Sequence, residues 1–68
     1  MTMRQAMVHA RRIAAGRCNV QPHRGEGGER AIRITATWPD PAREIAAEIA
    51  EAIHGEVRTA AQWCAVWF

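Results

Sequence analysis

The sequence contains no leucine, although leucine is among the commonest residues of globular domains. Its apolar residues are mainly alanine, isoleucine, methionine and three tryptophans, and alanine alone occurs fourteen times. A chain of 68 residues also buries only about 60% of the surface that its unfolded form exposes. We therefore expect a single small domain, residues 1–68, with a thin core in which small side chains allow close packing.

Composition argues against several classes of protein. Apolar residues make up 49% of the chain and charged residues 24%, which is typical of a folded domain. No apolar run approaches the roughly 18 residues of a transmembrane helix, and residues 1–12 lack the apolar core of a secretory signal. Two cysteines, Cys18 and Cys64, are too few for a disulfide scaffold. We expect a cytoplasmic protein that is not an enzyme, because the core leaves few residues for an active site.

A first amphipathic helix is predicted from Thr2, a suitable N-cap, to about Ala15. Gly16 follows as a natural C-terminal cap, because glycine adopts the left-handed conformation without a steric penalty. Apolar residues recur on one face of this helix at the helical period: Met3, Ala6, Met7, Ala10, Ile13 and Ala14.

A second helix is predicted after the Trp-Pro-Asp-Pro segment. Asp40 suits the N-cap and Pro41 the first helical position, where its missing N–H group costs nothing. This helix should end at about His54, before Gly55. Its apolar stripe consists of Ala42, Ile45, Ala46, Ile49, Ala52 and Ile53.

Two alternating segments, residues 17–23 and 31–38, predict a β-hairpin around the glycine-rich loop 24–30. Pro22 predicts an edge position or the end of its strand. The tail, residues 56–68, is β-like and apolar on both sides, which is typical of a central strand or of a strand at an interface. We therefore predict an α+β fold of order α-β-β-α-β, with two helices on one face of a three-stranded antiparallel or mixed sheet.

Charge is distributed unevenly along the chain. Residues 1–38 carry seven arginines and two glutamates, a net charge of +5, whereas residues 39–68 carry two arginines and five acids, a net charge of −3. An arginine-rich surface fits phosphate groups or an acidic protein, although the two halves also neutralise one another in the fold.

The uncovered face of the predicted sheet is the best candidate for a binding surface. It would combine arginines, which bind phosphates and stack on bases, with tryptophan rings. Arginines of the first helix could extend this surface, although a solvated helix face is the simpler interpretation. The candidate binding residues are Arg4, Arg11, Arg12, Arg17, His23, Arg33, Thr35, Trp63, Trp67 and Phe68.

Catalytic and metal-binding patterns are weak. Cys18 and His23 form the one close pair of zinc-type ligands, and no second pair completes a four-ligand site. A nucleophilic Cys-His pair is conceivable with Cys18 or Cys64, but no recognisable motif supplies the third, orienting group or an oxyanion hole. Gly25 and Gly28 fit a bare GxxG pattern, but strands flank it and no Gly-Lys-Ser/Thr follows. We expect no metal and no cofactor.

At the level of a class, the small size and compact α/β composition resemble small phage or mobile-element proteins that act by binding, such as anti-CRISPR proteins. This resemblance implies an inhibitor or adaptor that occupies a surface of a host complex, with a protein as its partner. Two alternatives stay open. The sheet face could bind nucleic acid, or the chain could self-associate, for example as a dimer through its C-terminal strand. No membrane partner is expected.

Overall fold

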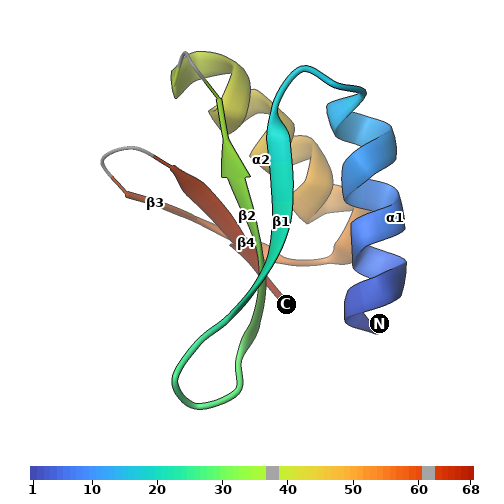
Figure 1. The fold of residues 1–68 in the computed structure, drawn as a ribbon, viewed down its shortest axis with the longest axis vertical. Coiled ribbons are helices and arrows are strands. Elements are labelled where there is room, and N and C mark those ends of the chain that lie inside the picture. The colour runs from blue at the N-terminus through green and yellow to red at the C-terminus, as the bar shows by residue number, and fades with distance from the viewer. Residues whose placement is uncertain (37–38, 61–62) are drawn as a thin grey trace.

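The computed structural model describes residues 1–36, 39–60 and 63–68, which form two helices and four strands (Figure 1). The α+β class is confirmed, but the predicted count of three strands is wrong. In chain order the elements are helix α1 (Met3–Ala14), strand β1 (Asn19–Arg24), strand β2 (Arg30–Thr35), helix α2 (Pro39–Ile53), strand β3 (Glu56–Thr59) and strand β4 (Cys64–Trp67).

The additional strand arises because the C-terminal tail folds back on itself. β3 and β4 pair as antiparallel neighbours, so residues 56–68 do not form the single predicted strand. β3 carries one apolar side chain, Val57, and neither glycine nor proline marks the turn after it, so the usual signals of a hairpin are missing. β4 lies between β2 and β3, where a strand apolar on both sides is expected.

The sheet has the order β1-β2-β4-β3 and is antiparallel throughout. β1 is an edge strand, as Pro22 predicted, because proline cannot donate a hydrogen bond to a neighbour. The β1–β2 hairpin extends past the ends of the helices (Figure 1). Its loop is closed by the Gly25 N–H group, which donates to the carbonyl of Glu29 at 2.9 Å.

The second half of the chain forms a split β-α-β unit. β2 and β3 run parallel because each is antiparallel to β4, which is inserted between them. The two termini meet at Arg30, whose guanidinium donates to the carbonyl of Met1 at 2.7 Å and whose carbonyl accepts from the Phe68 N–H group at 3.0 Å. The topology is therefore a circular permutation of the β-α-β-β-α-β order.

Helix α1 begins as predicted. The Thr2 hydroxyl accepts from the Gln5 N–H group at 3.2 Å, and the Gln5 side chain accepts from the Thr2 N–H group at 2.9 Å, which completes a capping box. At the other end the C-cap is Ala15, at φ 48°, and Gly16 follows it at φ 80°. The left-handed turn therefore starts one residue before the glycine predicted to make it.

Helix α2 begins at Pro39, so the predicted cap at Asp40 with Pro41 in the first position is wrong. Pro39 itself suits the first helical position, because an N–H group there has no partner within the helix, so its absence from proline costs nothing. At the C-terminus, His54 adopts φ 56° and the Gly55 N–H group donates to the carbonyl of Ala50 at 2.9 Å. A Cβ on Gly55 would approach Val66 Cγ1 to 2.6 Å, so this close approach requires glycine.

Both helices pack on one face of the sheet, as predicted, and the core lies between them and the sheet. Small residues allow the two helices to contact each other as well as the strands. Trp38 and Thr37 lie outside the described residues, and the other two tryptophans are not in this core, so its buried side chains are aliphatic, sulfur-containing or alanine. They include Met7, Ala10, Ile32, Ile34, Ile45, Ile49, Cys64 and Val66.

Within the described segments, neither helix has the length and apolar character needed to cross a bilayer.

Candidate binding face

The face of the sheet opposite the helices, called the open face below, carries every second residue of each strand. Strand pairing places Gln21 beside Arg33, His23 beside Ala31, and Ala31 beside Trp67. The core residues Ile32, Ile34, Cys64 and Val66 have the opposite parity, which fixes the direction of the remaining side chains. The open face therefore carries Asn19, Gln21, His23, Ala31, Arg33, Thr35, Glu56, Arg58, Trp63, Ala65 and Trp67.

Five side chains of this face form a continuous series, called the cation–aromatic row below. The guanidinium carbon of Arg33 lies 5.0 Å from the centre of the Trp63 ring. The His23 ring lies between the two tryptophans, 6.3 Å from Trp63 and 5.8 Å from Trp67 between centroids. Arg58 ends the row, 5.4 Å from the Trp67 ring. Each of the four strands contributes one residue to the row, and the fifth member, Trp63, directly precedes β4.

The row covers the middle of the open face. Ala31 and Ala65 are on this face, away from the helices, and yet their exposed fraction is 0%. Ala31 is paired with His23 and Trp67, and Ala65 with Arg33 and Arg58, all members of the row. The small alanines thus form a floor on which the larger side chains lie, and the row itself stays partly exposed.

The two arginines of the row differ in their surroundings. The Arg33 Nε atom is buried, and no described residue accepts a hydrogen bond from it. Arg58 Nη2 instead lies 3.4 Å from the carboxylate of Glu56, and both side chains are largely exposed. Burial of an unpaired donor is unfavourable, so the position of Arg33 over Trp63 carries a cost that no described partner offsets.

A second carboxylate borders the other end of the row. Gly25 lies close to both the Glu29 carboxylate and the Trp67 ring, since a Cβ on Gly25 would be 2.6 Å from Glu29 Oε2 and 3.3 Å from Trp67 Cζ3. A surface pocket lies beside it, with Arg58, Phe68 and residues 28–30 in its lining. Both acids near the row, Glu29 and Glu56, are therefore at the Trp67–Arg58 end.

The structure brings together four of the predicted binding residues, His23, Arg33, Trp63 and Trp67, and places Thr35 on the same face. Sequence reasoning missed Arg58. Interpreting residues 56–68 as one strand gave Arg58 no position beside Trp67, and the alternation of Glu56, Val57 and Arg58 was the available signal.

The other predicted binding residues lie elsewhere. Arg4, Arg11 and Arg12 are exposed on α1, which packs against the opposite face of the sheet. Placing Arg17 on the open face was wrong, because β1 starts after it. Its guanidinium donates to the carbonyls of Ile13 and Ala14 and lies 3.7 Å from the Glu48 carboxylate on α2.

Phe68 is also not part of the open face. It packs against the helix-covered core, and the Arg30 guanidinium lies 5.0 Å from the centre of its ring. The C-terminal strand β4 has neighbours on both sides, so strand pairing with a second copy is open to β1 and β3 and not to β4.

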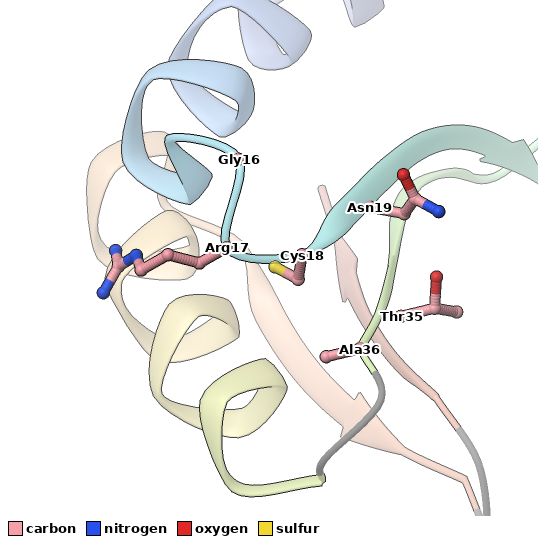
Figure 2. Close-up of a pocket in the computed structure, with 6 residues that line it drawn as sticks. All are labelled: Gly16, Arg17, Cys18, Asn19, Thr35 and Ala36. Carbon is pink, nitrogen blue, oxygen red and sulfur yellow. The ribbon is translucent and has the colours of Figure 1, made fainter.

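A separate pocket lies where α1 turns into β1, and Figure 2 shows the residues that line it. The side chains of Asn19 and Thr35 point to one side, whereas the Cys18 sulfur and Ala36 point to the other and Arg17 reaches away toward α2 (Figure 2). Burial raises the pKa of the Cys18 thiol, and the positive charge of Arg17 partly opposes that rise. The neutral thiol is thus favoured, which makes Cys18 a poor nucleophile.

In the described part of the chain, no three His, Cys, Asp or Glu side chains gather into a group that could hold a metal ion. Both cysteines are free thiols, Cys18 partly exposed and Cys64 buried. Comparison with known proteins found no matching family model, no matching curated protein and no matching solved structure.

Proposed function

We propose that this chain is a non-enzymatic binding protein that holds a macromolecular partner against the open face of its sheet. The cation–aromatic row carries this proposal. Tryptophan and arginine are the residues most enriched at the energetically dominant positions of interfaces. In this chain they form one cluster, although they come from separate parts of the sequence.

The contacts within the row support a binding role because they hold the side chains in place before a partner arrives. An arginine side chain loses rotamer freedom when it binds, and that loss weakens association. Stacking of Arg33 on Trp63 and of Arg58 on Trp67 removes much of this freedom in the folded chain. The guanidinium groups still have N–H donors left for a partner.

The mode of action that we propose is occupancy. The chain is compact, with a radius of gyration of 10.5 Å, and all four strands contribute side chains to the open face. A small rigid domain bound through such a face covers the surface it occupies and excludes competitors from it. Such a protein acts as a stoichiometric inhibitor or adaptor, the role that its size and composition suggest.

Differential capture tests this proposal. Tagged wild-type protein is incubated with a lysate of the source cells, in parallel with the double variant Arg33→Gln/Arg58→Gln. The matched control is Arg4→Gln/Arg11→Gln, which removes the same charge from α1. Protein and nucleic acid in each eluate are both quantified, with and without nuclease, and circular dichroism verifies the fold of each variant.

We expect a species that the wild type and the α1 control retain and that the open-face variant loses. If the α1 control loses the same species to the same extent, or if no retained species depends on the row, the open face is not the binding surface.

A further inference from the structure

We propose that the partner on the open face is single-stranded nucleic acid, an inference that rests on the proposed function of that face. The cation–aromatic row offers flat rings and guanidinium groups in alternation across an antiparallel sheet. Unstacked bases bind proteins by stacking on aromatic rings and on arginine planes, and four-stranded sheets are used in this way for RNA.

The row offers several neighbouring stacking positions, so it can bind successive bases of one strand and not only a single base. Trp63 and Trp67 are partly exposed, and His23 lies between their rings at about 6 Å from each. A base can extend a stack either on a tryptophan ring or on the guanidinium that already lies over it. Every base has a π-face, so such a surface binds single strands with little dependence on sequence.

Hydrogen-bonding side chains flank the Arg33 end of the row. Asn19 and Gln21 are exposed on β1, and Thr35 lies opposite Asn19 on β2. Their amide and hydroxyl groups can bond to base edges and to the sugar. Arg33 stands beside Gln21, and the Nη donors of its guanidinium can bond to a phosphate oxygen.

Charge along the row gives the bound strand a preferred end. No acid is in contact with Arg33, within the described residues, whereas Glu56 and Glu29 are near Arg58 and Trp67. The exposed acids of α2, Glu44, Glu48 and Glu51, belong to the helix layer behind the sheet. Phosphate is therefore bound chiefly at the Arg33 end, and Glu56 weakens binding at the other end.

A direct titration tests this inference. A fluorescein-labelled oligo(dT) of about ten nucleotides, and the matching oligo(rU), are titrated with purified protein at ~50 and ~200 mM salt, with anisotropy as the readout. Quenching of intrinsic tryptophan fluorescence reports stacking on the row in the same samples. We expect saturable binding that weakens with salt and quenches the tryptophans.

Variants separate stacking from general attraction. Trp67→Leu keeps an apolar cover but removes the ring, and we expect it to weaken binding about fivefold or more, whereas Trp67→Phe restores most of the affinity. Arg33→Gln should lower the slope of log affinity against log salt by about 0.7, the value for one phosphate of a single strand. Arg11→Gln on α1 should change neither readout by a comparable amount. Equal losses for Arg33→Gln and Arg11→Gln would indicate unspecific attraction and overturn the proposal.

Glu56→Gln discriminates between occupants. It removes a negative charge from the face and releases Arg58, so nucleic acid should bind the variant more tightly than the wild type. For a second copy of the chain, in contrast, the same change makes both facing surfaces more positive, so like-charge repulsion should weaken that association.

The inference and the proposed function fail separately. Lack of oligonucleotide binding at ~50 mM salt, together with row-dependent capture of a protein from nuclease-treated lysate, overturns the nucleic-acid inference and leaves the binding role intact. Concentration-dependent tryptophan quenching without oligonucleotide, with a doubled mass by light scattering, identifies a second copy as the occupant and also overturns it. If the chain binds no oligonucleotide, captures no protein through the row and does not self-associate, both proposals are overturned.

Discussion

The two faces of the sheet are covered in different ways. On the helix side, Ile32, Ile34 and Val66 are fully buried beneath two helices and belong to the hydrophobic core cluster. On the open face, Ala31 and Ala65 are equally buried, but beneath a single layer of tryptophan, histidine and arginine. The first arrangement excludes water completely, and the second leaves polar groups at the surface. The helix side therefore supplies most of the stability, whereas the open face is the surface on which we propose that a partner binds.

Ile34→Ala on the helix side should have the largest effect on stability. The Ile34 side chain is completely buried opposite Cys64, so its truncation removes apolar contacts and leaves a cavity. We expect a loss of about 2–5 kcal/mol in the free energy of unfolding, measured by urea denaturation. In a domain with a thin core this loss brings the chain close to unfolding. A cost below that of Trp67→Leu would contradict the division between the two faces.

Gly55→Ala tests the junction where helix α2 meets the central strand. The new Cβ would lie 2.6 Å from Val66 Cγ1 and 2.8 Å from the Trp67 carbonyl oxygen, and the backbone atom cannot move without disturbing β4. We expect a destabilisation of about 1–3 kcal/mol by overpacking, visible as a lower midpoint of urea denaturation. Gly27→Ala is the control, because the atoms nearest to its Cβ would belong to the flexible end of the Glu29 side chain. An equal cost at both glycines would show that the close approach is unimportant.

Arg33→Gln should separate binding from stability on the open face. The contact of Arg33 with Trp63 contributes about 0.5–1 kcal/mol, so the variant stays folded. We expect a small shift in thermal denaturation together with a clear loss of partner binding, which is the reverse of the pattern for Ile34→Ala. A large loss of stability without any change in binding would instead assign the row to the fold alone.

The sequence predicts the local elements better than their assembly. Thr2 locates the start of α1, Pro22 an edge strand, and the alternation around Trp63 and Trp67 the two sides of β4, because each of these signals is local. Arg17 was misplaced because the turn after Ala15 lasts longer than its glycine suggests, so β1 starts two residues later than predicted. The glycine-rich loop also predicted the pairing of β1 with β2, but local patterns gave no information on the pairing of β2 with β4.

The assembly of the row depends on such non-local pairing. Arg58 reaches Trp67 only because β3 folds back beside β4, and His23 reaches both tryptophans only because β2 brings β1 and β4 to the same sheet. The predicted arginines of α1 are of the same residue type as those of the row, but they do not lie on the open face. Residue type therefore identified candidates, and the sheet order selected among them.

Cys18, in the turn between α1 and β1, should give the smallest effect on stability. Its alkylation tests how well this edge of the core is protected from water. Burial holds its pKa above the ordinary value, against the opposing charge of Arg17, so the rate of reaction with iodoacetamide should rise at higher pH than for a free thiol. A thiol whose pKa is raised by folding favours the folded state below its unfolded pKa, and this contribution is lost as the pH rises through the folded value. Stability at alkaline pH should therefore fall slightly more in the wild type than in Cys18→Ala. The buried Cys64 is common to both proteins, so the difference between their pH profiles isolates Cys18. If the alkylation rate follows the same pH profile as in an unfolded peptide, Cys18 is open to water and the helix-side core ends before it.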